Sequence, residues 1–225
     1  MKTQLLDARI FSIVLGLALA CDRGNPPSAP VSRINASSRH FSTSDGQGDR
    51  RSASEGGRFR WDIISVDFPT GTLSAGGVAL ADANDGSKIT LTGSGTFRTG
   101  DQEEVTGGGT WEIFDAGGTS TGKGTYRVRE FVRFDEAPGT PPLPHDNIGP
   151  LANARAGLLV LRTSYSDGSG GVLVVSCHLV GSPNTIVEGV TASKGFVGFL
   201  QELPPAPPGN ANRTVFHVLS EEEDD

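Results

Sequence analysis

The sequence contains few of the features from which a function is usually inferred. It has only two cysteines, Cys21 and Cys177, too few for a disulfide-rich scaffold. Its longest apolar run, residues 10–20, would form a helix of about 16 Å, half of a ~30 Å hydrocarbon core, so this run is too short to span a bilayer. There is no stripe of basic residues and the formal net charge is −7. This balance excludes the electrostatic footprint of a nucleic-acid-binding protein.

Motifs for metal, phosphate or acyl chemistry are missing as well. The four histidines, at positions 40, 145, 178 and 217, are far apart and form no HxH or HxxxH pair. No G-x-S-x-G elbow occurs, and the many Gly-x-Gly steps lie in predicted strands with no helix after them, so none of them is a phosphate-binding loop. We therefore predict no metal site and no cofactor.

The first residues have the layout of a signal peptide. Lys2 and Arg9 belong to a short charged start, which is followed by the apolar run 10–20 and then by Cys21. The segment Leu17-Ala18-Leu19-Ala20-Cys21 resembles the lipobox of bacterial lipoproteins, in which the cysteine receives a diacylglycerol and becomes the new N-terminus. It departs from the usual pattern by having Ala18 at position −3, with Leu17 at −4.

The lipobox resemblance implies a location and a membrane contact. Cys21 would be the lipidation site, and the protein would be anchored in the cell envelope on the extracytoplasmic side. With Cys21 acylated, Cys177 has no cysteine partner for a disulfide. The departure at −3 leaves a second interpretation open, in which the protein is secreted or periplasmic and soluble.

Composition divides the chain into four parts. Residues 1–20 are the predicted signal peptide, and residues 21–57 are the lipidated cysteine and a stalk rich in Ser, Gly, Arg and Pro. The stalk has too few apolar residues to offset its ordering entropy, so we expect it to be disordered. Residues 58–219 are long enough for one domain with a substantial core, and residues 220–225 form an acidic disordered tail.

The domain has the pattern of an all-β protein. Glycine is abundant, at 31 residues in the chain, and apolar residues alternate with polar ones in runs bounded by Gly, Asp, Asn or Ser. These runs predict eight or nine strands near 58–68, 73–82, 87–98, 104–115, 122–134, 155–165, 171–180, 187–200 and 213–219. We expect the proline cluster 204–208 to let the last strand return to pair with the first.

An internal repeat indicates how the strands are arranged. It occurs at 93–97 (GSGTF), 107–111 (GGGTW) and 122–126 (GKGTY), with threonines 14 and 15 residues apart. This spacing fits one strand plus one turn, so consecutive copies should be antiparallel neighbours. In each copy the glycines and the aromatic residue share one face, which favours a curled sheet. The prediction is a single antiparallel meander that closes into a small β-barrel of about eight strands, with a β-sandwich as the alternative.

The alternation also assigns side chains to the two faces of the sheet. Cys177 shares a face with Leu173 and Val175 and is interpreted as a small buried apolar residue. The other side chains predicted to point inward are Ile89, Leu91, Phe97, Trp111, Ile113, Tyr126, Val128, Val132 and Phe134.

Glu130 is the residue that breaks the inward set. Buried, it would be an acid, a base or a ligand anchor with a cation such as Arg162 nearby; alternatively, a β-bulge near Arg129 would turn it to solvent. The long proline-rich segment 136–153 begins six residues later. It could lie over a barrel mouth with His145 and Asp146 at its tip, or be a stiff surface crossover.

Histidine 178 has the same ambiguity, because it would be either a polar group in a cavity or a surface or structural residue. If the domain has a ligand site, we expect it at a barrel mouth, formed from Glu130, His178, Arg162 and His145.

Three classes of function remain open. The domain could bind a small apolar ligand or a protein partner, it could be a structural or assembly lipoprotein without a pocket, or it could be an enzyme with its site in the barrel interior. A hollow interior would separate the first and third classes from the second. An ionisable pair inside the hollow would favour an enzyme.

Overall fold

The computed structural model describes residues 56–205 and 211–220. The predicted signal peptide, Cys21, most of the stalk and residues 221–225 lie outside these ranges. Within them, no helix combines the length and the apolar character needed to cross a membrane.

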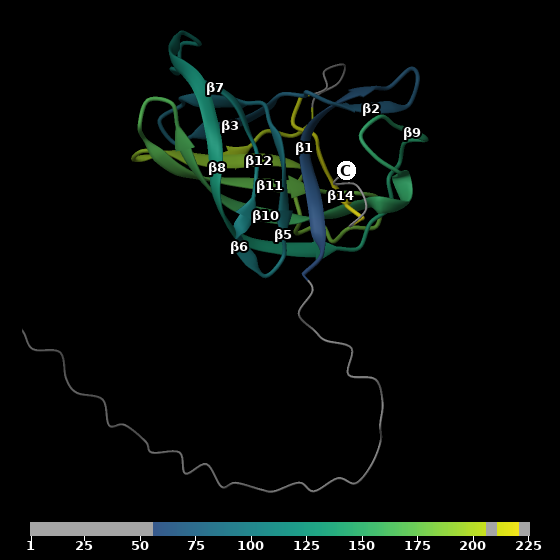
Figure 1. Ribbon diagram of the computed structural model, residues 1–225. Helices are drawn as coiled ribbons and strands as arrows, with labels where there is room; N and C mark the ends of the chain where they lie inside the picture. The colour runs from purple at the N-terminus through teal and green to yellow at the C-terminus, as the bar shows by residue number, and fades with distance from the viewer. Residues whose placement is uncertain (1–55, 206–210, 221–225) are drawn as a thin grey trace, which may run out of the picture. The chain divides into compact units, whose positions relative to one another are not determined.

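The regular secondary structure of the described residues is almost entirely β-strand, which confirms the predicted all-β fold class (Figure 1). One short 3-10 helix, η1 (Leu151–Asn153), is the exception. The strands are β1 (Arg58–Asp67), β2 (Thr72–Ala75), β3 (Ala79–Ala83), β4 (Lys88–Leu91), β5 (Ser94–Arg98), β6 (Asp101–Val105), β7 (Gly108–Phe114), β8 (Ser120–Ala137), β9 (His145–Asp146), β10 (Ala154–Tyr165), β11 (Gly170–Cys177), β12 (Gly189–Lys194), β13 (Val197–Glu202) and β14 (Thr214–Val218).

Eight of these strands close into a ring. Following the hydrogen-bonded neighbours gives the order β7–β8–β10–β11–β12–β13–β3–β4 and then β7 again, and every pairing is antiparallel. Closure leaves these strands without exposed edges along the ring, which is how all-β proteins avoid edge-to-edge association.

A second set of strands connects two sides of the ring. β5 pairs with β7 only at Ser94 and Gly108, and then runs along β1. β14 pairs with β1 on the other edge and also with the first two residues of β10. The last strand therefore returns to the first, as the proline cluster predicted. β2 continues from β1 as a hairpin, and the two-residue β9 adds to β2 in parallel.

Four of the predicted strands are each divided in two by a glycine-containing break. The breaks lie near Gly76, Gly93, Gly107 and Gly195, where the chain turns or changes its pairing partner. The repeat is affected too, because the second and third copies pair directly as β7 and β8, whereas the first copy pairs mainly with β1. The expected simple meander is therefore interrupted at Gly93, after which the chain leaves β7 and pairs with β1 as β5.

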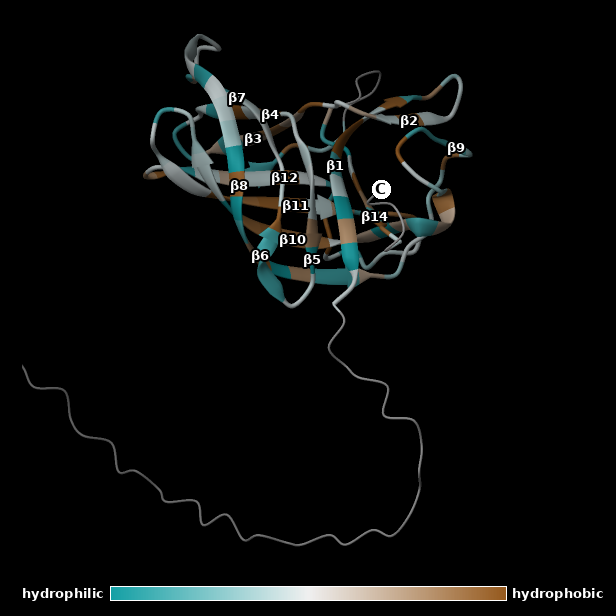
Figure 2. Ribbon diagram, viewed as in Figure 1, coloured by the Kyte–Doolittle hydropathy of each residue, from teal (hydrophilic) through white to brown (hydrophobic). Residues whose placement is uncertain are grey.

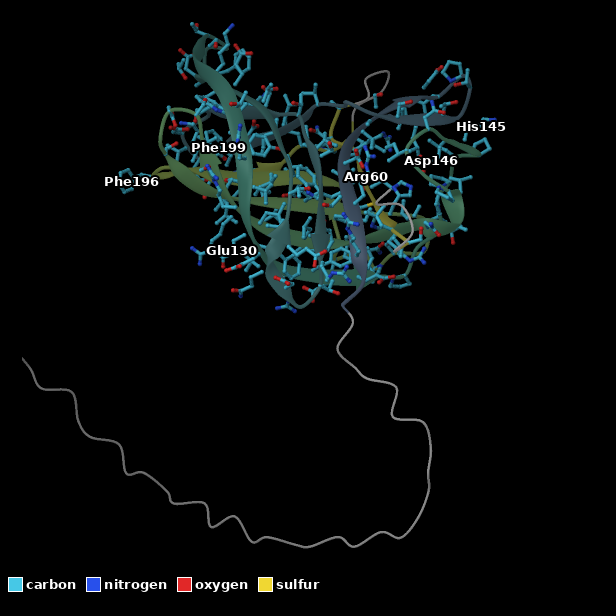
Figure 3. The ribbon with its side chains drawn as sticks, viewed as in Figure 1. Arg60, Glu130, His145, Asp146, Phe196 and Phe199 are labelled. Atoms are coloured by element: carbon cyan, nitrogen blue, oxygen red, sulfur yellow. The ribbon has the colours of Figure 1, made fainter. Side chains whose placement is uncertain are left out.

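The interior of the ring is filled by side chains. Phe97, Phe199 and Phe216 are fully buried, and Phe97 stacks on both Phe59 and Phe131 with ring centroids 5.3 Å apart. Figure 2 shows hydrophobic residues alternating with hydrophilic ones along β1. Phe199 belongs to this core, whereas Phe196, at the β12–β13 turn, projects into solvent (Figure 3).

Trp61 lies in a cradle made by the glycines of the repeat. Its side chain is fully buried, and a Cβ added at Gly95 or Gly107 would lie 2.8 or 3.0 Å from its indole ring. Gly107 also has φ +121°, a conformation that side-chain-bearing residues rarely adopt. The first two copies of the repeat therefore leave the space that Trp61 fills. In the third copy, Gly122 and Gly124 similarly approach Trp111.

Most of the residues predicted to point inward are buried or packed against the core, including Trp111 and Cys177. The inward assignment of Val132 is wrong. Its side chain is 42% exposed. The pairing of β8 with β10 shifts register twice, which leaves Arg129 and Val132 as extra residues on β8. Each bulge reverses the alternation, so Phe131 points inward and Val132 outward.

Adding one methyl group to the Trp61 cradle should destabilise the protein. In Gly95→Ala the new Cβ would lie 2.2 Å from the Thr106 carbonyl oxygen, a contact that the backbone must move to relieve. We expect a loss of about 2–3 kcal/mol of unfolding free energy and a urea midpoint lower by roughly 1 M. Gly170→Ala is the matched control, because its Cβ would meet nothing closer than 3.8 Å. Equal midpoints for the two variants would show that the cradle is not tightly packed.

Candidate functional site

A polar groove lies on the outer side of β1, away from the core. It has a volume of about 360 Å³ and runs between the outer face of β5, β1 and β14 and the chain segment 148–150. We call it the arginine groove, and its lining residues are Arg58, Arg60, Thr96, Ile148, Gly149, Pro150, His217, Val218 and Leu219.

The alternation of β1 places charged residues on this face. Phe59 and Trp61 point into the ring, so Arg58, Arg60 and Asp62 point outward. In the antiparallel pairing, Arg60 is directly opposite Thr96 of β5 on one side and His217 of β14 on the other. Three neighbouring strands therefore bring an arginine, a hydroxyl and an imidazole side by side.

Asp62 fixes the position of the Arg60 guanidinium. Nε and Nη2 of Arg60 donate to the two carboxylate oxygens at 2.7 and 2.8 Å. The Asp62 side chain is fully buried, and burial raises the pKa of its carboxyl, although the hydrogen bonds from Arg60 oppose this shift. The same contact raises the pKa of Arg60. Arg60 itself is 36% exposed at its side chain, so one end of the pair is anchored and the other reaches the groove.

Asp146 and His217 form a second, fully buried pair beside it. The Asp146 Oδ2 and His217 Nε2 atoms are 2.8 Å apart, and both side chains are 2% exposed or less. The other carboxylate oxygen, Oδ1, accepts the backbone N–H groups of Ile148 and Gly149. An ionised carboxylate only accepts hydrogen bonds, so with such a carboxylate the donor in this contact would be Nε2 of the imidazole. The Nδ1 atom has no hydrogen-bond partner within the described residues.

The Asp146–His217 pair attaches the proline-rich segment to the sheet. Gly149 lies against the imidazole, where an added Cβ would be 3.1 Å from Cδ2. Next to the pair, Leu143 and Ile148 pack on a small apolar cluster that includes Val66 and Val215. The segment therefore follows the surface of β1, β2 and β14. Of the two alternatives left open by the sequence, this is the surface crossover.

Glu188, the residue before β12, anchors the start of β14 in a similar way. Its carboxylate accepts the backbone N–H groups of His178 and Thr214, which connects the end of β11 to the start of β14. Burial raises the pKa of Glu188 to about 7, against the lowering effect of these two hydrogen bonds. His178 is half-buried, and its Nδ1 atom lies 2.8 Å from the Ile186 carbonyl oxygen. Its position is that of a structural residue.

Of the four site residues suggested by the sequence, the structure brings Glu130 and Arg162 together but not His178 and His145 with them. The first bulge of β8 turns Glu130 to the outer face, where it pairs with Arg162 at 3.2 Å between Oε2 and Nε. Both side chains are substantially exposed, and Figure 3 shows Glu130 well away from Arg60 and Asp146. His145 is exposed, and its backbone N–H donates to the Gly71 carbonyl oxygen.

The arginine groove was missed because its main contacts join distant residues. Asp146 and His217 are 71 residues apart, and no spacing rule connects them. One signal was present, since the predicted first strand has Arg60 and Asp62 two residues apart and therefore on one face.

A larger hollow, of about 460 Å³, lies over β4, β7 and β8. Its polar lining is mainly threonine hydroxyls that bond to one another or to backbone, as in the 2.8 Å contact between Thr92 and Thr110. Three of its four threonine hydroxyls are thus engaged within the sheet, whereas the arginine groove presents guanidinium groups, so the arginine groove is the better candidate site.

The groove is suited to holding an anion. A guanidinium presents five N–H donors, and the two contacts with Asp62 leave donors on Nη1 of Arg60 for a carboxylate or phosphate. A carboxylate and an imidazole can also perform general-base catalysis. Here, however, Nδ1 of His217 is buried, and the one hydroxyl among the lining side chains is Thr96. Within the described residues, no group of three His, Cys, Asp or Glu side chains is arranged for metal binding.

Comparison with known proteins assigns neither a family nor a function to this chain. No family model, no curated protein and no solved structure is similar enough to the chain to count as a match.

Removing the Asp146 carboxylate should release the segment that covers the groove. In Asp146→Ala, His217 Nε2 and two backbone N–H groups lose their acceptor, which should cost about 2–3 kcal/mol. We expect the amide hydrogens of Ile148 and Gly149 to exchange at least tenfold faster, measured by NMR. His145→Ala, one residue earlier and exposed, should leave both rates unchanged. Unchanged exchange in Asp146→Ala would mean that other contacts hold the segment.

Proposed function

We propose that this chain is an exported, lipid-anchored protein whose β domain binds an anionic group of a small polar molecule or of a protein partner. The observation that carries the proposal is the arginine groove. Arg58 and Arg60 line it, the buried Asp146–His217 pair forms part of its wall, and Asp62 holds the Arg60 guanidinium in place. Preorganised donors of this kind reduce the entropy cost of binding.

The filled interior supports a site on the outer surface. Large aromatic side chains occupy the centre of the ring, and residues such as Trp61 and Phe97 are 1% exposed or less. This packing disfavours a small apolar ligand held inside the ring, which was one of the classes suggested by the sequence. It also disfavours an enzyme with its site there. A surface groove with charged walls favours a ligand that carries charge.

The groove also argues against a purely structural lipoprotein. A buried imidazole and carboxylate, beside a buried arginine-bound aspartate, are costly to desolvate. Attachment of a surface segment alone could be achieved by apolar packing, as Leu143 and Ile148 already show. Charged groups concentrated around one hollow are better explained by a ligand that they recognise.

The membrane anchor is the part of the proposal that comes from the sequence alone. The charged start, the short apolar run and Cys21 resemble a lipoprotein signal. We expect Cys21→Ser to move the protein from the membrane fraction to the soluble fraction. We also expect the mature wild-type N-terminus to carry a diacylglycerol mass, measured by mass spectrometry. An unmodified cysteine at this position would contradict the anchor.

Anion binding can be tested on the mature chain with inorganic phosphate and citrate as probes. Titration followed by NMR should shift the backbone amides of Arg60, Gly149 and His217 together. In Arg58→Ala the affinity for citrate should fall about tenfold, because a charged hydrogen bond is worth roughly 1.5–3 kcal/mol.

Arg162→Ala is the matched control, since Arg162 is an exposed, ion-paired arginine outside the groove. It should bind citrate as the wild type does. Shifts scattered over all surface arginines, or equal losses in the two variants, would contradict a specific groove.

A further inference from the structure

A second, smaller pocket lies on the outer surface where β8 pairs with the end of β10. Its volume is about 160 Å³, and it shares no lining residue with the arginine groove. We call it the β8–β10 pocket. Its polar side chains include Arg127 and Arg129 of β8, Ser164 of β10, and Ser166, the first residue after β10 to line it. Among the described residues that line this pocket, none is acidic.

The pairing of β8 with β10 brings the two arginines to one place. Arg127 is directly opposite Ser164, whereas Arg129 is the extra residue of the first bulge. Nε of Arg129 donates to the hydroxyl oxygen of Ser164 at 2.6 Å. The Arg129 guanidinium therefore reaches the residue that faces Arg127. Bulges commonly redirect a side chain in this way, and they are frequent beside binding sites.

The two arginines and the two serines keep hydrogen-bond donors for a ligand. The contact of Arg129 with Ser164 uses Nε, so its Nη1 and Nη2 groups stay available. Ser164 accepts that hydrogen bond, and Ser166 accepts one from the backbone N–H of Thr125, so these contacts leave both hydroxyl hydrogens free to donate. The pocket therefore combines donors from two neighbouring strands.

Other arginines on these two strands are already paired with carboxylates. Arg133 of β8 contacts Asp135 at 2.6 Å, and Arg162 of β10 contacts Glu130 at 3.2 Å. In the described part of the chain, no carboxylate forms an ion pair with either arginine of the pocket. Two like charges on one face repel each other, and an anion bound between them removes this repulsion.

Asp167, which follows Ser166 in the sequence, is engaged with other partners. Its carboxylate accepts hydrogen bonds from the hydroxyl and the backbone N–H of Ser169, and it forms an ion pair with Lys194. The Lys194 side chain is only 10% exposed, and its ammonium group lies over the Trp111 ring. The charge of this aspartate is thus balanced by a lysine rather than by the arginines of the pocket.

We propose that the β8–β10 pocket binds a tetrahedral oxyanion, the terminal phosphate or sulfate group of a soluble compound or of a lipid headgroup. Guanidinium groups on one strand and hydroxyl groups on its neighbour surround the pocket. A tetrahedral group presents oxygens in several directions and can accept from both strands at once, whereas a carboxylate has two oxygens in one plane. The inference goes beyond the proposed function, because this site is separate from the arginine groove.

An exposed phenyl ring near the pocket makes a lipid headgroup worth testing as the source of the anion. Gly170, opposite Ser164, accepts the backbone N–H of Gly195, and the next residue is the fully exposed Phe196 (Figure 3). Two strand spacings, about 10 Å, separate this turn from Ser164. A headgroup phosphate in the pocket would leave Phe196 within reach of the same membrane surface.

The first test titrates sulfate and inorganic phosphate into the mature chain, with NaCl of equal ionic strength as the reference. Four backbone amides should shift together in the NMR spectrum, those of Arg127, Arg129, Ser164 and Ser166. In Arg127→Gln the affinity should fall about tenfold or more, because one charged hydrogen-bond donor is lost. Arg127 is exposed, so this variant should keep the wild-type melting temperature. Malonate, a dianion like sulfate but with planar carboxylates, should bind more weakly.

Arg133→Gln is the matched control, since Arg133 is an exposed arginine of the same strand with its own carboxylate. It should bind sulfate as the wild type does. No saturable shift of the four amides, or equal sulfate affinity in Arg127→Gln, would overturn the inference, and equal affinity for malonate would overturn the tetrahedral class. The amides of Arg60 and His217 report on the arginine groove, so failure of either site is seen separately.

A vesicle sedimentation assay distinguishes the two sources of the anion. It uses the mature chain with Cys21→Ser, which no acyl chain can hold to a bilayer, and phosphatidylcholine vesicles with or without phosphatidic acid. Binding that requires phosphatidic acid and is lost in Arg127→Gln would assign the anion to a lipid headgroup. Sulfate-induced shifts that depend on Arg127, without vesicle binding, would assign it to a soluble compound. Vesicle binding that Arg127→Gln leaves unchanged would overturn the lipid source.

Discussion

The burial of Trp61 is the constraint on which the arrangement of the domain depends. A fully buried tryptophan needs neighbouring strands that carry no side chain where the indole lies, and Gly95 and Gly107 meet this need. Because β5 is drawn onto β1 opposite Trp61, the chain turns away from β7 at Gly93. The same pairing exposes the other face of β1. The core residue thereby determines where the charged residues Arg60 and Asp62 lie, and hence where a groove can form.

β14 serves the core and the groove at the same time. Phe216 points inward to the aromatic cluster, and the next residue, His217, points outward to Asp146. The pairing register of such a strand is strongly constrained. A shift of one residue would place the imidazole of His217 in the core and the phenyl ring of Phe216 on the outer face. Glu188 adds a further restraint at the first residue of the strand. The groove wall is consequently held in a fixed register with the core behind it, which suits the binding of a ligand by preorganised groups.

The sequence was sufficient for the fold class, the approximate strand positions and most of the faces, because period-two alternation and glycine punctuation are local signals. It was insufficient where one extra residue reverses which side chains point inward. Val132 was assigned to the inner face because the two bulges of β8 cannot be recognised from the alternation of apolar and polar residues. Glu130 remained undecided for the same reason. The candidate site was harder still, since the Asp146–His217 contact depends on how a proline-rich segment folds back over the sheet. Only the Arg60–Asp62 half of the groove lies within one strand and could be found from spacing.

The pairing of the first strand with the last has a practical consequence for anyone who handles this domain. Arg58 and Leu219 are joined by a backbone hydrogen bond, so both ends of the folded domain leave at the rim of the groove. A purification tag or a fused fluorescent protein at either end would sit in front of the candidate site. The turn at Gly168 is exposed, and a Cβ added there would meet no atom within 4 Å, so labels placed at this turn would keep the entrance clear.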